Sequence, residues 1–170
     1  ERITETLPAS TKTPAETPPL MDRFEFPSIG GERSTSATPF EELSRVDEET
    51  QRAFLKRFTH VAEAEQRKYG VPASVTLANG LLLSRAGERG MARQGHIFFA
   101  LPCTEDWGGA SGAYHGNCYR HYENAWTSFR DHSLYLTTGR LAPLRQQAGH
   151  SYQAWAEGLE KAGFGEGKDY

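Results

Sequence analysis

Carboxylates in the middle of the chain are the side chains best suited to acid–base chemistry. Glu88 stands alone, whereas Glu105 and Asp106 are adjacent in a stretch rich in glycine and aromatic residues. A carboxyl group donates or accepts protons in hydrolytic sites when its surroundings move its pKa. Such acids are also typical of solvated turns and helix starts, and His115 is typical of a surface histidine. We therefore regard these four residues as weak candidates for proton transfer.

Cys103 and Cys118 are the only cysteines, and they bracket this glycine-rich stretch. A disulfide between them would close a loop of about 16 residues, stabilise it by roughly 3 kcal/mol and indicate an oxidising compartment. We predict this disulfide. One alternative is a pair of inert buried thiols. The other is a zinc site that adds His115 and His121 to Cys118, which is disfavoured because positions three apart on a strand point to opposite faces.

Helix caps and apolar stripes predict most of the elements that position these groups. The predicted helices are a short one from the Thr38–Pro39 cap, then residues 47–70, 72–85, 124–139 and 151–162. Residues 96–102 are predicted to be a strand or a buried loop, and residues 103–122 an irregular β-hairpin. The predicted core stripe of helix 72–85 is Leu77, Ala78, Leu81 and Leu82, with Leu83 on another face. The predicted inward residues of the last helix are Tyr152, Trp155, Ala156 and Leu159.

The first 40 residues differ in composition from the rest of the chain. They hold six of the nine prolines and eleven serines or threonines, a composition too polar to offset the entropy of ordering. We expect residues 1–42 to be a linker or tail and residues 43–170 to be a folded domain. The linker contains an apolar cluster in residues 20–30, and its members are Met21, Phe24, Phe26 and Ile29. This cluster is either a strap on the domain surface or a docking peptide for another protein.

Overall charge limits the partners. A net charge of −3 argues against nucleic acid and anionic membrane, since both attract basic surfaces. No apolar run approaches the roughly 18–20 residues needed to span a bilayer. The sequence begins with Glu1 rather than methionine, so we expect a signal peptide or an anchor to have been removed upstream.

Four sequence blocks carry a family resemblance. They are residues 69–80 (YGVPASVTLANG), 118–122 (CYRHY, paired with Cys103), 128–133 (SFRDHS) and 152–163 (YQAWAEGLEKAG). Together, over roughly residues 50–165, they resemble glycoside hydrolase family 73, the peptidoglycan-cleaving β-N-acetylglucosaminidases. The resemblance implies an α+β, mainly α fold: a lysozyme-like helical domain with a small disulfide-pinned β-hairpin lobe. It also implies a location in the periplasm or the outer cell envelope of a bacterium.

The family's general acid is a glutamate near the end of the helix that covers residues 72–85 here. Ser84 and Gly87 match the family's Leu-Glu-Ser-x-x-Gly pattern, so Leu83 occupies the place of the glutamate. Glycoside cleavage needs an acid to protonate the leaving group, and leucine has no proton to donate. Such acid catalysis contributes about 10²–10⁴-fold to the rate.

Three further departures from the family fall at cleft positions. Residues 97–102 (IFFALP) replace the family's Asn-x-Phe-Gly-Ile-Lys, and residues 114–117 (YHGN) lack the acids usual between the cysteines. Phe164 replaces a tyrosine that faces the cleft, which removes one hydroxyl group. The packing blocks remain while the cleft changes, so the resemblance implies a degenerate member of the family.

We therefore expect an inactive glucosaminidase-like domain of the bacterial cell envelope. It would bind peptidoglycan glycan or act as a scaffold for protein partners, which residues 20–30 would contact, and it would need no cofactor or metal. The expected groove residues are Asn79, Leu83, Phe99, Trp107, Tyr114, Tyr119, Tyr122 and Phe164. Of these, Trp107, Tyr114, Tyr119 and Tyr122 suit either sugar stacking or hairpin packing. The alternative is an active endo-β-N-acetylglucosaminidase with a displaced carboxylate, Glu88, Glu105 or Asp106. An engineered Glu→Leu inactivation would leave the other departures unexplained.

Overall fold

The structure, a computed structural model, describes residues 37–164, so the apolar cluster of residues 20–30 lies outside the described residues. The elements are α1 (Pro39–Ser44), α2 (Glu48–Tyr69), α3 (Ala73–Ser84), α4 (Gly90–Gly95), β1 (Ser111–Tyr114), β2 (Asn117–Arg120), α5 (Ala125–Thr137), the 3₁₀ helix η1 (Gly139–Leu141), α6 (Ala142–Ala148) and α7 (Tyr152–Lys161). The fold is mainly helical with one two-stranded antiparallel sheet, as the sequence predicted.

Local hydrogen bonds explain where the helices begin. Thr38 and Glu41 form a reciprocal capping box at α1, with Pro39 at the first helical position. The side chains of Asp47 and Ser151 accept bonds from backbone amides in the first turns of α2 and α7. These side chains satisfy amide groups that no intrahelical carbonyl can reach, so the predicted starts are confirmed.

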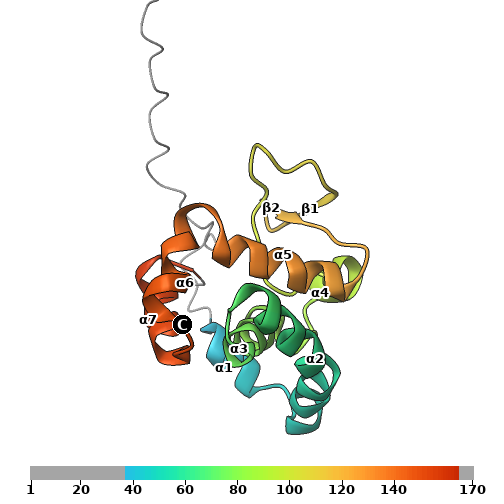
Figure 1. The fold of residues 1–170 in the computed structure, drawn as a ribbon. Coiled ribbons are helices and arrows are strands. Elements are labelled where there is room, and N and C mark those ends of the chain that lie inside the picture. Colours follow the sequence, from blue (N-terminus) through green and yellow to red (C-terminus); the bar gives the residue numbers. More distant parts are fainter. Residues whose placement is uncertain (1–36, 165–170) are drawn as a thin grey trace, which may run out of the picture.

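Helix α3 lies at the centre of the helical lobe, between α2 and α7, with α5 crossing nearby (Figure 1). Gly80 permits the close approach of α2 and α3, because a Cβ there would lie only 3.1 Å from the ring of Phe54. A cluster of phenylalanine rings with centroids 4.8–6.1 Å apart fills the space between α2, α5 and the loop before the hairpin; its members are Phe54, Phe58, Phe98, Phe99 and Phe129. These rings supply much of the buried apolar surface.

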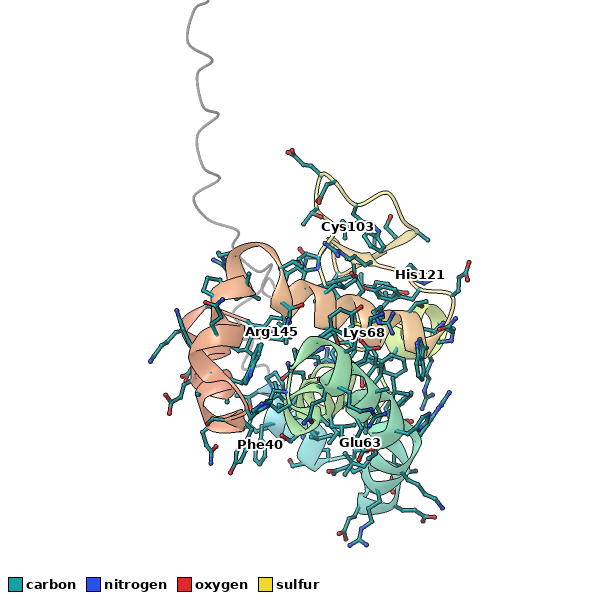
Figure 2. The ribbon with its side chains drawn as sticks, viewed as in Figure 1. Phe40, Glu63, Lys68, Cys103, His121 and Arg145 are labelled. Atoms are coloured by element: carbon teal, nitrogen blue, oxygen red, sulfur yellow. A yellow bond between two sulfur atoms is a disulfide. The ribbon has the colours of Figure 1, made fainter. Side chains whose placement is uncertain are left out.

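The β-hairpin forms a separate small lobe, which carries Cys103 and His121 on the far side of α5 from Glu63 (Figure 2). Its two-residue turn is His115–Gly116, and both residues have positive φ (49° and 81°), as a type I′ turn requires. A disulfide joins Cys103 to Cys118, which confirms the predicted pairing. The zinc interpretation is wrong, because the sulfur of Cys118 is bonded to the other cysteine.

Two predictions about buried faces are only partly confirmed, since Leu77, Leu81 and Leu82 are no more than partly buried against the core. In α3 the buried face contains Thr76, Asn79, Gly80 and Leu83, whereas the predicted stripe of Leu77, Ala78, Leu81 and Leu82 is only partly buried or exposed. In α7, Trp155 and Leu159 are buried as predicted, but Tyr152 is 56% exposed and Ala156 is also exposed. The neighbouring helices, rather than the apolar pattern of each helix, decide which face is covered.

The loop before the hairpin was left open as a strand or a buried loop, and it is a buried loop. Ile97, Phe98, Phe99 and Leu101 are buried, and Pro102 alone forms an isolated bridge, to Tyr119. The sequence analysis missed α4 and α6. Within residues 37–164, no helix combines the length and the apolar character that crossing a bilayer requires.

Candidate functional site

The end of α3 is built as a tight, hydrogen-bonded turn. The hydroxyl of Ser84 donates to the Gly80 carbonyl at 2.5 Å and accepts from the Gly87 amide at 2.8 Å. The three residues that follow Ser84 all have positive φ, 55°, 53° and 83°. Leu83, one residue before this turn, is 4% exposed and belongs to the main hydrophobic core. The position that the family resemblance assigns to the acid is therefore apolar and filled.

A buried histidine of α5 packs against the face of α3 that carries Leu83. It contacts Asn79, which lies one turn before Leu83. His132 of α5 accepts a hydrogen bond at Nε2 from the Asn79 side-chain amide, at 3.1 Å, and its ring stacks on Phe99 with centroids 3.9 Å apart. The side chain is completely buried, and burial lowers the pKa of His132 to about 3. The imidazole is therefore neutral at physiological pH.

The two most buried carboxylates are held in ion pairs. Glu65 of α2 is 1% exposed and accepts from Arg130 Nε with both oxygens, at 2.9 Å and 3.0 Å. Asp131 of α5 accepts from Arg120 Nη1 at 3.1–3.2 Å and from the Tyr122 hydroxyl at 2.6 Å. Burial, and then the Asp131 charge, raise the pKa of Tyr122. These pairs join elements of the fold, as expected for structural carboxylates.

Arg120 ties the hairpin lobe to α5. Besides Asp131, its guanidinium donates to the Pro102 carbonyl at 3.0 Å and to the Thr104 hydroxyl at 3.1 Å. It also lies over the ring of Trp107, 4.6 Å from the centroid. The sequence of α5 alone could not identify this partner of Asp131, because Arg120 comes from a different element.

The three candidate substitute acids lie apart from Leu83 in the sequence and have different surroundings. Glu88 is paired with Arg93 at α4. Glu105 and Asp106 are exposed in the loop that leads to β1. A hydrogen bond from Thr104 lowers the pKa of Asp106, which favours its charged form. A general acid needs a raised pKa, so Asp106 is poorly tuned for that role. Among residues 37–164 no cluster of potential metal ligands is present.

Most of the expected groove residues are core residues. Asn79, Leu83, Phe99, Tyr119, Tyr122 and Phe164 are buried, whereas only Trp107 and Tyr114 are partly exposed. The structure thus brings Asn79, Leu83, Phe99 and Phe164 into the helical core and places the other four in the hairpin lobe. Their role in glycan binding stays a prediction, and the partly exposed pair offers the accessible aromatic surface.

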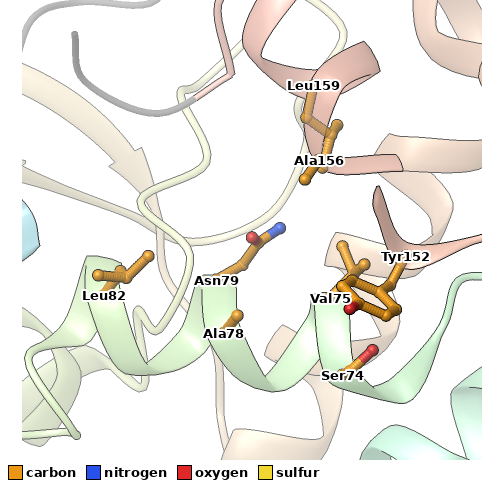
Figure 3. Close-up of a pocket in the computed structure, with 8 residues that line it drawn as sticks. All are labelled: Ser74, Val75, Ala78, Asn79, Leu82, Tyr152, Ala156 and Leu159. Carbon is orange, nitrogen blue, oxygen red and sulfur yellow. The ribbon is translucent and has the colours of Figure 1, made fainter. Parts of the chain in front are cut away.

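A pocket that the sequence analysis missed opens between α3 and α7 (Figure 3). Its volume is about 260 Å³, and its lining residues are Ser74, Val75, Ala78, Asn79, Leu82, Tyr152, Ala156 and Leu159. The available signal was the small residues Ala78 and Ala156, which the sequence analysis had assigned to buried faces. Small side chains leave space where larger ones would pack.

Comparison with solved structures places this fold in a known class. A Staphylococcus aureus N-acetylmuramoyl-L-alanine amidase matches with a TM-score of 0.61 and 21% identity, over 71% of this chain and 38% of that one. The catalytic domain of the Listeria monocytogenes autolysin Auto matches with a TM-score of 0.56 and 17% identity, over 67% and 75%. The glycoside hydrolase domain of Salmonella typhimurium FlgJ matches with a TM-score of 0.54 and 22% identity, over 67% and 77%. These likenesses define a lysozyme-like, glucosaminidase-type fold.

The family follows from the sequence itself. The glucosaminidase family, described as mannosyl-glycoprotein endo-β-N-acetylglucosaminidase, matches residues 59–170, which is more than half of the chain. The chain therefore belongs to the glucosaminidase family, and the predicted resemblance is confirmed. No curated protein matches the sequence significantly.

Proposed function

We propose that this chain is a catalytically inactive glucosaminidase-like domain of the bacterial cell envelope. It acts as a peptidoglycan-binding or scaffold subunit of an envelope complex. The observation that carries the proposal is Leu83, which is 4% exposed and packed in the core at the position that the family resemblance assigns to the acid. A carboxylate at this buried position in the hydrophobic core would lose its hydration, so the surrounding packing suits leucine.

The state of the other carboxylates supports the same proposal. Glu65, Asp131 and Glu88 are each engaged by an arginine. The acid of a glycosidase must instead be poised to give up a proton beside the scissile bond, with the second carboxylate about 5–9.5 Å away. Among the three candidate substitute acids, Glu105 and Asp106 are exposed in the hairpin lobe and are the first candidates if the enzyme is active.

An envelope location is supported by the family and by the structural relatives, whose names include an autolysin and an N-acetylmuramoyl-L-alanine amidase. The Cys103–Cys118 disulfide supports an oxidising compartment outside the cytoplasm, such as the periplasm. Export to the envelope or anchoring there belongs to the same proposal.

The proposal is tested by incubating the purified protein with peptidoglycan and measuring released muropeptides by mass spectrometry. We expect no products from the unmodified chain. Products that disappear in the Glu105→Gln/Asp106→Asn variant would refute inactivity and identify the displaced acid. A Leu83→Glu variant tests whether the groove still positions glycan, since regained activity requires bound substrate. Leu83→Gln is its matched control, because glutamine has nearly the same shape but cannot donate a proton as an acid.

Glycan binding is tested separately by cosedimentation with insoluble peptidoglycan. If the hairpin lobe contacts sugar, Trp107→Ala and Tyr114→Ala should each lower the bound fraction, because both side chains are partly exposed there. Trp126→Ala on α5 is the control, since Trp126 is 44% exposed outside the hairpin lobe. Absence of any bound protein would leave the scaffold role as the surviving form of the proposal.

A further inference from the structure

The pocket between α3 and α7 has the size and chemistry of a site for aromatic side chains. Its lining contains no charged residue, and its walls carry the small side chains of Ser74, Ala78 and Ala156 (Figure 3). An apolar protein cavity of roughly 150 Å³ is large enough to bind benzene. A pocket of about 260 Å³ therefore has room for one phenyl ring and part of a second.

Exposed aromatic side chains lie on the helices around the pocket. Tyr152, which lines the pocket, is 56% exposed. Phe40 of α1 is 64% exposed, and α1 packs against α3. Exposed apolar surface that is contiguous with an apolar pocket, as it is at Tyr152, is typical of a docking site.

The chain itself supplies a segment of suitable chemistry. Phe24 and Phe26 are two positions apart, and Arg23 and Glu25 alternate with them. On an extended backbone, the two rings would lie on one face about 6.6 Å apart, and both charged side chains would face the other way. Such a segment presents its apolar face to a pocket without burying a charge.

The connection is long enough for this segment to reach the pocket. Phe26 and Ala37 are eleven positions apart, so the chain between them spans at most about 36–40 Å. A domain of this size has a radius of gyration of about 14 Å, so that span matches or exceeds its diameter. The tether also starts at α1, which packs against a wall of the pocket, α3. Because the segment is tethered, its effective concentration at the pocket is of the order of millimolar. A weak intrinsic affinity is therefore enough for the segment to occupy the pocket.

We propose that Phe24 and Phe26 dock into the pocket between α3 and α7 of the same chain. The pocket is then an intramolecular docking site for an extended aromatic segment. A protein partner that binds residues 20–30 must displace them from the pocket, so partner binding and pocket occupancy exclude each other.

Disulfide trapping in the full chain tests this docking. Phe26→Cys combined with Ala156→Cys places one thiol on the segment and one at the pocket, and mild oxidation with peptide mapping measures their cross-link. The control combines Phe26→Cys with Lys56→Cys, because Lys56 is exposed on α2 and does not line the pocket. We expect at least a tenfold higher yield for the pocket pair, within monomers. Equal yields, or cross-links found only between chains, would overturn the proposal.

A stability measurement provides a second, independent test. Replacing both rings with Phe24→Ser/Phe26→Ser should lower Tm by about 2–5 °C, because the segment loses its buried surface. The matched control, Ile3→Ser/Leu7→Ser, removes two apolar side chains elsewhere in the linker and should leave Tm unchanged. Ala156→Leu, which fills part of the pocket, should reduce the effect of removing the rings. Equal Tm values for the ring variant and the control would contradict docking.

Discussion

The buried histidine makes a quantitative prediction about acid stability. His132 is completely buried, contacts Asn79 and Phe99, and has a pKa of about 3 in the folded chain. In the unfolded chain its pKa is about 6.5. Below pH 6.5 the unfolded state therefore binds a proton that the folded state does not bind. The contribution of His132 to stability is complete above pH 6.5 and is lost as pH falls toward 3.

The size of the loss at pH 5 depends mainly on the unfolded state. At that pH the folded imidazole is still neutral, whereas the unfolded one lies 1.5 pH units below its own pKa. Each unit corresponds to about 1.36 kcal/mol, so protonation of His132 alone lowers the free energy of unfolding by about 2 kcal/mol relative to neutral pH. This loss would be a large share of the stability of a small domain.

Urea denaturation at pH 7.5 and pH 5.0 measures this effect in the unmodified chain and in His132→Gln. Glutamine keeps a group that can accept a hydrogen bond from Asn79 but does not titrate. The unmodified chain should lose about 2 kcal/mol more free energy of unfolding than the variant between the two pH values. The contributions of all other titrating groups are common to both chains and cancel in the comparison. Equal losses, or an imidazole signal of His132 that titrates near pH 6.5 in the folded protein, would refute the reasoning.

Three other predictions concern the hairpin lobe, and urea denaturation measures each. Arg120→Ala should lower the free energy of unfolding by about 2–3 kcal/mol, because it leaves the largely buried carboxylate of Asp131 without its ion pair. The control is Arg52→Ala, which breaks an exposed ion pair. An equal loss of stability in the control would contradict the role of the buried pair. His115→Asn should raise stability by about 0.5 kcal/mol, since asparagine suits a positive φ better; any loss would count against the turn. Cys103→Ser/Cys118→Ser should cost about 3 kcal/mol and speed amide exchange in β1 and β2; unchanged exchange would argue against the pinning role.

Helix starts were predicted well because their signals are local. A capping side chain bonds to amides two or three positions away, so Thr38, Asp47, Asn124 and Ser151 indicate a helix start wherever the helix later packs. The short helices α4 and α6 lack such a side-chain cap, and both were missed. The disulfide was predictable for a similar reason, since only two cysteines were available to pair.

The buried face of α3 was not predictable because this helix is apolar on nearly every side. Leu77, Leu81 and Leu82 form as convincing a stripe as the true one, and the true one contains the polar residues Thr76 and Asn79. A polar side chain can be buried when a distant partner bonds to it, as His132 of α5 does for Asn79. A pattern within one helix cannot show that partner.

By itself, the sequence determined the family, the helix starts and the disulfide, and it predicted that Leu83 stands at the position of the family's acid. These features depend on residue identity or on neighbours a few positions away. Only the tertiary structure decided that Leu83 is a core residue, that most of the expected groove side chains are buried, and that α3 and α7 leave a pocket between them. Each of these depends on contacts between different elements of the chain, and packing in three dimensions sets those contacts.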